Sequence, residues 1–447
     1  MTECETWGIT KISFIEKDKT DKMNKENTKS LSSMFHEMGL YIGTFLKWLV
    51  VASLIGGAGG MLGATFHHSI ELAEHTRKEN PWLLWLLPAA GILIVGFYKA
   101  TQTEGLNTNN VIRAVHKGRR LSVFLLPAIF FGTVLTHLCG GSAGREGAAL
   151  QMGGTMGQWI GRGLHLDDSD LRIATLAGMS AFFSALFGTP LAAAVFAVMV
   201  ISIGILYHVA LVPCLIASLS AYFLSLALDV KPIRFAIAVP ETTPLMFFKV
   251  GLLGILCALV SILFCMMMQG TEKYLHKRIP NPWLRAVAGG CGVIALTYLC
   301  GTTDYNGVGM DVITRAVEEG KAEPAAFILK LLFTSVTLAA GFKGGEIVPS
   351  FFVGATFGCV IAPLIGIPAG FGAAIGLVCV FCGVTNCPIS SIFLSIELFG
   401  AQGMLYFAVA CCISYMMSGY RGIYSSQMIM YSKRKAKFIN AYTNGKN

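Results

Sequence analysis

Long apolar stretches dominate the pattern of hydrophobic and polar positions along the chain. They recur between about residues 42 and 418, and several extend over 18 residues or more. A helix needs about 20 apolar residues to cross the hydrocarbon core of a bilayer. Transmembrane strands would instead give alternating segments of about 10 residues, which these runs do not resemble. The pattern therefore predicts an all-α, polytopic membrane protein.

A second group of apolar runs is short, or is interrupted by glycine and proline. The runs at 350–362 and 388–399 are too short to cross a bilayer alone, and the run at 171–201 is broken at Gly188–Pro190. Helices that end inside a membrane are tolerated only where their ends line a cavity or are buried in protein. We therefore expect tilted, broken helices whose ends surround an internal site.

The most informative feature is a set of motifs that repeats after about 200 residues. The segment 141–148 recurs as 341–348, with Gly144 and Glu146 matched to a glycine and a glutamate, and Gly154 recurs as a glycine at 354. Two further pairs keep the same order along the chain. The segment 111–115 is matched by 312–317 upstream, and 189–191 is matched by 387–389 downstream. Three ordered pairs indicate two related structural halves.

The domain organisation follows from this repeat and from the polar ends of the chain. We expect a polar N-terminal cytoplasmic segment at 1–40, a membrane domain at 41–435 and a basic C-terminal tail at 436–447. The repeat halves of the membrane domain are expected at about 80–230 and 280–430. Basic residues follow Glu397 without any further acid, which predicts a cytoplasmic C-terminus.

The composition excludes several other classes of protein. The 447 residues are 54% apolar and 13% charged, whereas a soluble domain carries about 25% charged residues. The chain is therefore not a soluble enzyme, a nucleic-acid binder or a disordered segment. Most of the 13 cysteines lie in apolar runs, and the pair Cys379 and Cys382 has no second ligand pair at zinc spacing. We expect no metal site and no cofactor.

Glycine-rich turns precede several predicted helices. Asn107 or Asn109 can cap the helix that follows the turn at 105–109, and Asp311 is expected to cap a helix at 312–319. The start of a helix carries unpaired N–H groups and a partial positive charge, so it can bind an anion. Alternatively, the glycines only permit close packing of helices. Three helix starts are expected to converge near the middle of the membrane: 105–109, 144–148 and 344–348.

Glu146 is the leading candidate for chemistry. A carboxylate inside a membrane is destabilising unless it is paired or functional, and the start of a helix stabilises it. Glu146 can occupy the place of an anion, leave when protonated and so couple anion movement to protons. Alternatively, it is a capping acid paired with Arg145. Glu346 is a possible second ionisable site, although Glu346 and Glu397 are more simply structural hydrogen-bond acceptors.

A distant alternative is an intramembrane serine hydrolase. Residues 140–144 fit the pattern G-x-S-x-G around Ser142, and His137 lies nearby in the sequence. A nucleophile of this kind needs a strand before it and a helix after it. Here a helical apolar run precedes Ser142, and the sequence gives no evident His–Asp pair.

The motif set resembles that of the CLC family of anion channels and proton-coupled antiporters. The resemblance covers about residues 40–435 and is carried by the segments 144–147, 344–349 and 422–425. It implies a homodimer with one anion pore per subunit, two inverted halves and Glu146 as the gating glutamate. It further implies that backbone amides hold the anion, with a tyrosine hydroxyl contributed from the last helix. The implied anion-binding residues are Gly105, Leu106, Asn107, Arg145, Gly147, Ala148, Ile347, Val348 and Tyr424.

Several positions depart from the pattern of typical chloride-transporting members. Leu106 stands where such members have a serine, and Ala148 replaces a proline. The segment 345–349 is closer to the fluoride-exporting branch, although Val348 stands where that branch has a threonine. The internal proton glutamate of many antiporters is replaced by apolar residues near Met199.

The sequence therefore predicts a protein that moves a halide, chloride or fluoride, across a lipid bilayer. We expect an anion/proton antiporter gated by protonation of Glu146, with a passive voltage- or pH-gated chloride channel as the alternative. A multi-pass homodimer in the plasma membrane of a bacterium is expected, with no nucleic-acid partner and no enzymatic activity.

Overall fold

The computed structural model describes residues 4–435 and 437–443, with side chains described from residue 33 onward. The chain forms two compact units, residues 1–51 and 52–447. Helix α1 (Cys4–Glu79) accounts for the described part of the first unit and continues into the second. The predicted polar segment at 1–40 is therefore helical from residue 4 onward.

The second unit is a body of packed helices. Residues of the first predicted half form η1 (Pro81–Leu86), α2 (Leu87–Ala100), α3 (Thr108–Lys117), α4 (Leu125–Leu138), α5 (Glu146–Gly163), α6 (Asp168–Phe187), α7 (Pro190–Met199), η2 (His208–Ala210) and α8 (Leu211–Ala227). The long α9 (Pro244–Arg278) leads to the second half. That half forms α10 (Pro282–Cys300), α11 (Met310–Glu318), α12 (Ala326–Ala339), α13 (Ile347–Ile361), η3 (Ala362–Ile365), α14 (Ala369–Thr385), α15 (Pro388–Phe399) and α16 (Met404–Met417).

The helix lengths fit the predicted mixture of full and partial membrane crossings. Within the described residues, seven helical segments are long and apolar enough to span a bilayer, and six apolar helices have only 10–17 residues. The break predicted at Gly188–Pro190 is confirmed, because α6 ends at Phe187 and α7 begins at Pro190. Pro190 fits the first position of α7, where a helix needs no N–H donor.

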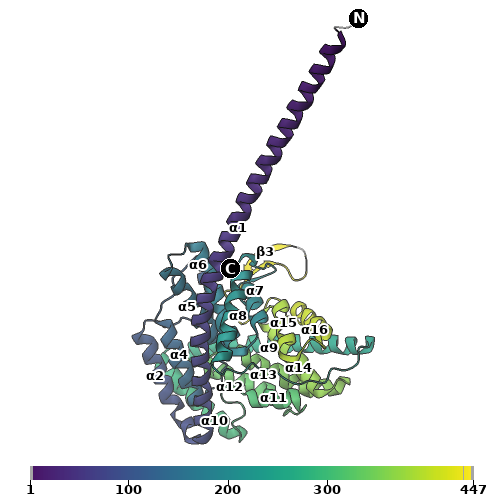
Figure 1. Cartoon of the computed structure of the whole chain (residues 1–447). Helices are drawn as coiled ribbons and strands as arrows, with labels where there is room; N and C mark the ends of the chain where they lie inside the picture. Colours follow the sequence, from purple (N-terminus) through teal and green to yellow (C-terminus); the bar gives the residue numbers. More distant parts are fainter. Residues whose placement is uncertain (1–3, 436, 444–447) are drawn as a thin grey trace. The chain divides into compact units, whose positions relative to one another are not determined.

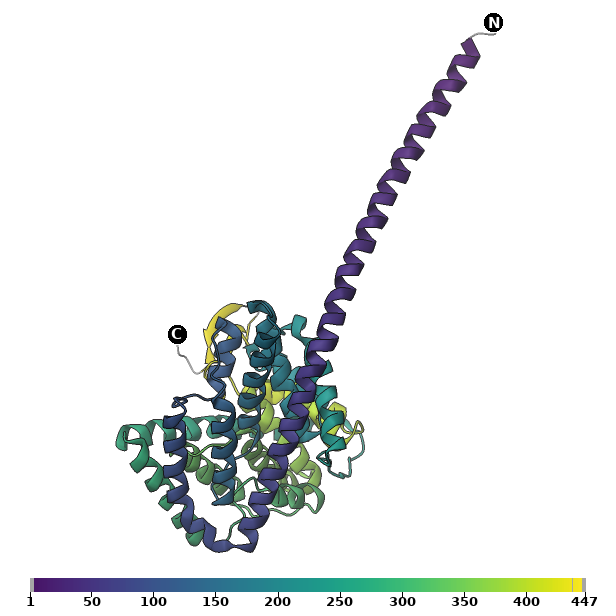
Figure 2. The ribbon, with the colours of Figure 1, turned by 60° about the vertical axis from the view of Figure 1, so that its left-hand side comes forward.

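Helices α5 and α6 pack closely in the first half, as α13 and α14 do in the second. A Cβ atom on Gly153 would lie 2.3 Å from the carbonyl oxygen of Gly178, and one on Gly354 would lie 2.2 Å from that of Gly376. Gly153 therefore corresponds in the structure to Gly354, whereas the sequence match had paired Gly154 with Gly354. Figures 1 and 2 show the helices of both halves gathered in one body. The inverted relation of the two halves stays a prediction.

A small sheet, which the sequence pattern did not predict, joins the segment after α7 to the segment after the last helix. Strand β1 (Ser202–Ile203) pairs in parallel with β2 (Met428–Tyr431), and β2 pairs antiparallel with β3 (Phe438–Tyr442). In Figure 1, β3 lies at the same end of the unit as α7. Strand β3 falls within the segment predicted as a basic tail at 436–447. The tail residues 436 and 444–447 lie outside the described residues.

Candidate functional site

The two glycine-rich turns of the repeat meet directly. The N–H of Gly144 donates to the carbonyl of Gly345 at 2.8 Å, and the N–H of Gly345 donates back at 2.6 Å. This bridge is antiparallel. It pairs Gly144 with Gly345, whereas the sequence match had paired Gly144 with Gly344. A Cβ atom on Gly345 would overlap the N–H of Gly147. Only glycine therefore allows the two turns to approach this closely.

A third helix start joins the two turns. Asn107, one of the two predicted candidates, is the N-cap of α3, and its N–H donates to the side chain of Asn110 at 3.2 Å. The Thr108 hydroxyl lies 3.4 Å from the carbonyl oxygen of Gly147, in the first turn of α5. The structure thus brings the starts of α3, α5 and α13 together, which the spacing of the glycine turns predicted.

A cavity of about 300 Å³ lies beside this convergence. Its walls include the turn at 105–109, Gly344, Glu346 and Tyr424. The hydroxyl of Tyr424 is buried and has no hydrogen-bond partner among the described residues. A buried donor without a partner is destabilising until a ligand or water satisfies it. The cavity therefore offers a hydroxyl donor and an exposed helix start to a small anion.

Glu146 begins α5 and is completely buried. Its carboxylate accepts the N–H of Arg145 at 3.0 Å, and its other oxygen lies 3.4 Å from the Arg145 Nε atom. Glu146 does not line the cavity. The carboxylate sits instead against the bridged turns, because its Oε2 atom lies 2.8 Å from where a Cβ atom on Gly144 would be. Both predicted features, the pairing with Arg145 and the position at a helix start, are present together.

The other predicted residues take different places. Glu346 is the N-cap of α13 and lines the cavity, so it occupies the position equivalent to Arg145 rather than to Glu146. Gly147, Ala148, Ile347 and Val348 are buried in the first turns of α5 and α13. Gly105, Leu106 and Asn107 line the cavity, whereas Arg145 does not.

Two sequence-based expectations were wrong about local position. Tyr424 does not lie in the last helix, because α16 ends at Met417 and Tyr424 belongs to the irregular segment before β2. Asp311 does not cap α11. Gly309 is the N-cap of that helix, and Asp311 accepts a hydrogen bond from Lys78 at 2.6 Å. Gly309 has a φ of 80°, a conformation that glycine adopts without strain and aspartate does not.

Two more candidates have structural partners. The Ser142 hydroxyl lies 3.0 Å from that of Thr334, and both ring nitrogens of His137 face backbone carbonyls, so no Ser–His pair forms. The Glu397 carboxylate accepts the N–H groups of Leu191 and Ala192, both at 2.9 Å. Glu397 therefore satisfies the start of α7 and acts as a structural acceptor.

Sequence reasoning missed several polar side chains of the cavity wall: Gln151, Gln269, Glu272, His276, Arg285 and Lys343. Lys343 stands between the glycines of the second turn, with its ammonium 4.1 Å from the centre of the Tyr98 ring. Gln151, one turn into α5, donates to the Gly147 carbonyl at 3.2 Å, and its own carbonyl oxygen has no partner among the described residues. For Lys343, the available sequence signal was a lysine inside an apolar run. The sequence around Gln151 gave no such signal.

The fold and the site define a helical membrane protein with converging helix starts, a polar cavity and a buried acid. Residues 91–419 match the voltage gated chloride channel family, so the chain belongs to the CLC family. It is 34% identical over 398 residues to a chloride/fluoride channel protein of Pseudomonas syringae pv. tomato, covering 87% of each chain. It is 25% identical to an H(+)/Cl(-) exchange transporter of Cronobacter sakazakii, covering 83% of this chain and 86% of the relative.

A solved structure supports the same assignment. The crystal structure of a CLC-type fluoride/proton antiporter superposes with a TM-score of 0.82 at 30% sequence identity, covering 86% of this chain and 98% of the other. This protein is thus a mostly helical, multi-pass integral membrane protein with the CLC fold, and it is not an enzyme.

Proposed function

We propose that this chain is a halide/proton antiporter in which Glu146 carries the proton and gates the anion. The observation that carries the proposal is the burial of the Glu146 carboxylate where the two glycine turns meet, next to a cavity of about 300 Å³. The antiporter and exchanger named among the similar proteins support the same activity. The alternative, a passive channel, would need no proton on Glu146.

The mechanism follows from competition between two negative charges. As a carboxylate, Glu146 holds the N–H of Arg145 and faces its guanidinium, so an incoming anion is repelled. A proton on Glu146 neutralises this charge and weakens both contacts, which frees the start of α5 for the halide. When the halide leaves to one side of the membrane, the carboxyl group releases its proton to the other side and returns. Halide and proton thereby use one place in turn, and they move in opposite directions.

We further propose fluoride as the preferred halide, with chloride as the competing ion. Fluoride is named for two of the similar proteins. The first turn presents Leu106 and Asn107 in place of a serine hydroxyl. The Tyr424 hydroxyl and the amides at the helix starts are N–H and O–H donors of the kind that a small anion needs when it loses water. We also propose that the chain acts as a homodimer in the plasma membrane of a bacterium, with a cytoplasmic C-terminus.

Purified protein in liposomes tests this function. Vesicles loaded with fluoride or chloride are diluted into halide-free medium, with potassium and valinomycin to cancel the membrane potential. An antiporter stalls as protons accumulate, so a proton ionophore should raise the sustained halide efflux severalfold. An efflux that the ionophore does not change would instead identify a channel. The ratio of the initial fluoride and chloride rates gives the ion preference, and equal rates would contradict a preference for fluoride.

A further inference from the structure

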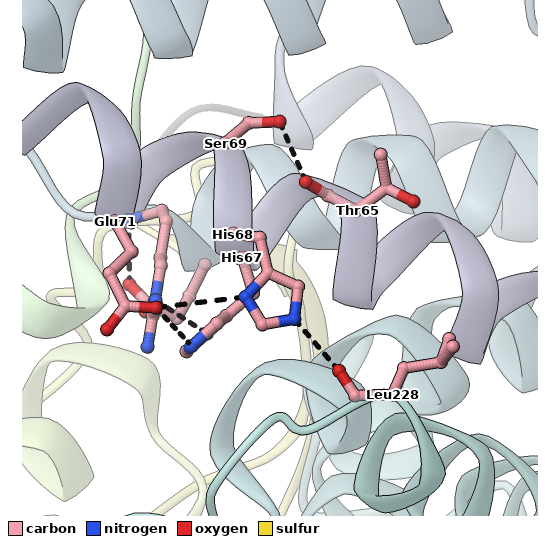
Figure 3. Close-up of polar contacts among 8 residues, drawn as sticks. Thr65, His67, His68, Ser69, Glu71 and Leu228 are labelled. Carbon is pink, nitrogen blue, oxygen red and sulfur yellow. Dashed lines mark hydrogen bonds and ion pairs between the residues drawn. The ribbon is translucent and has the colours of Figure 1, made fainter.

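A group of three metal-ligating side chains lies on α1, outside the site described above. His67, His68 and Glu71 present ligand atoms that all lie within 4.8 Å of one another. The Glu71 carboxylate oxygen is 3.7 Å from His67 Nε2 and 3.8 Å from His68 Nδ1, and Figure 3 shows both rings beside it. Four ligands around a tetrahedral zinc ion lie about 3.3 Å apart. Side-chain rotations that shorten these separations would close this group on an ion.

The cluster is accessible and begins where α1 turns polar. The side chains of His68 and Glu71 are 47% and 69% exposed. The apolar stretch of α1 ends just before His67, and the following residues up to Glu79 are rich in charged and polar types. Three protein ligands on an exposed face also leave a fourth position open for water.

His68 is already oriented as a metal ligand. Its Nε2 atom lies 2.9 Å from the carbonyl oxygen of Leu228, at the end of α8, as Figure 3 shows. A carbonyl can only accept, so Nε2 carries the proton and Nδ1, which faces Glu71, keeps its lone pair. Histidines that bind metals are commonly held this way, with the second ring N–H donated to a backbone carbonyl. This arrangement is an observation independent of the clustering.

His67 connects the cluster to the gate. Its Nδ1 atom lies 2.9 Å from the Arg145 guanidinium, which can only donate, so Nδ1 accepts and Nε2 carries the proton. A metal ion bound at Nε2 would need the proton on Nδ1 instead. His67 therefore cannot bind a metal and accept from Arg145 together. Arg145 in turn lies 3.4 Å from the Glu146 carboxylate.

We propose that His67, His68 and Glu71 form a binding site for a divalent transition cation such as Zn²⁺, and that its occupation inhibits transport. Binding of the ion breaks the contact between His67 and Arg145. The guanidinium then keeps its contact with Glu146. The Arg145 guanidinium then stabilises the charged Glu146 carboxylate more strongly, which opposes its protonation. The positive charge of Arg145 works against the ion, whereas the charge of Glu71 favours it. The inhibitory half of the proposal rests on the proposed function, but the site itself does not.

Calorimetric titration of the purified full-length protein with Zn²⁺ tests the site without reference to transport. We expect one zinc ion to bind per chain. His68→Gln and Glu71→Gln should each weaken the affinity for zinc by about tenfold or more. His75→Gln is the matched control, because His75 and Glu79 form a similar pair on the same helix, 3.6 Å apart, that belongs to no group of three among the described residues. Zinc bound to cysteines is common to all variants and cancels in the comparison. Equal affinities in wild type and His68→Gln would overturn the site.

Halide efflux from proteoliposomes tests the inhibition. Zn²⁺ should reduce the wild-type rate severalfold, a chelator should restore it, and the His68→Gln variant should lose this response while its zinc-free rate stays near that of wild type. Zinc binding that leaves the rate unchanged would overturn the link to Arg145. A wild-type protein that binds zinc but shows no halide efflux without it would contradict the proposed function instead.

Discussion

At the residue scale, the candidate site is marked by buried polar atoms that no other described residue satisfies. The hydroxyl of Tyr424 and the carbonyl oxygen of Gln151 have no partner among the described residues. By contrast, Glu397, Ser142 and His137 all have partners. An unsatisfied buried group is destabilising by about 1–3 kcal/mol. Such groups next to a cavity therefore indicate a place for ions and water.

The first residue-scale prediction concerns the Tyr424 hydroxyl. In Tyr424→Phe the halide loses one donor, so its affinity measured by calorimetry should fall by about fivefold to tenfold, corresponding to about 1 kcal/mol. The melting temperature in halide-free detergent solution should stay the same or rise, because the hydroxyl has no partner to lose among the described residues. Tyr406→Phe is the control. Its hydroxyl donates to the Glu241 carbonyl at 2.8 Å, so that variant should lose stability and keep its halide affinity. The reverse result would place Tyr424 in a structural role.

The second residue-scale prediction concerns pH. Protonation removes the negative charge of Glu146 and so favours entry of the anion, which means that halide efflux should rise as the pH falls. Efflux rates measured from liposomes with equal pH on both sides should show this rise in wild type. Glu146→Gln mimics the protonated acid, so its rate should be high and much less sensitive to pH. A pH profile that the substitution leaves unchanged would assign the proton to another group.

At the element scale, the close contacts of α5 with α6 and of α13 with α14 position the helix starts. Gly153→Ala places a methyl group 2.3 Å from the Gly178 carbonyl oxygen, so the helices must separate. We expect destabilisation by about 1–3 kcal/mol, measured as a lower melting temperature, and slower halide efflux. Gly57→Ala on α1 is the matched control, because nothing lies within 4 Å of its added Cβ atom. That variant should be neutral or slightly stabilised.

A second element-scale prediction concerns the β2–β3 hairpin. Lys433, in the connection between these strands, donates from Nζ to the Tyr415 carbonyl at 2.7 Å and lies near the Asn386 side chain at the end of α14. It thereby fastens the hairpin to the ends of α16 and α14. Lys433→Met keeps the length of the side chain and removes the donors, so proteolysis of the segment after α16 should become faster. Arg434→Met, at the next position, should leave the rate unchanged.

Some of this site was predictable because its signals are local. The break at Gly188–Pro190 and the cap at Asn107 depend on residues within one or two turns of the chain, and both are present. The end of the last helix before Tyr424 does carry a local signal, because Gly419 follows the C-cap Ser418 with a φ of 63°, the conformation in which glycine commonly ends a helix. A motif resemblance reports that a residue recurs. It does not report the element that carries the residue.

At the scale of the whole molecule, the unpredictable features are contacts between distant segments. The one-residue shift between the turns depends on the bridge from Gly144 to Gly345, which no local pattern encodes. The contact between His67 and Arg145 likewise joins two helices that the sequence treats separately. Length and hydrophobicity set the helices, whereas packing between the halves sets the register in which their ends meet.

Uphill proton transport tests the central claim most directly. Liposomes containing the protein are given an outward fluoride gradient and no proton gradient, and the internal pH is followed with a trapped dye. The account predicts that fluoride leaving wild-type vesicles drives protons inward, and that Glu146→Gln vesicles release fluoride without this acidification. Glu397→Gln, which alters a structural acceptor, should still move protons. Acidification by the Glu146→Gln protein would contradict the claim that this carboxylate carries the proton.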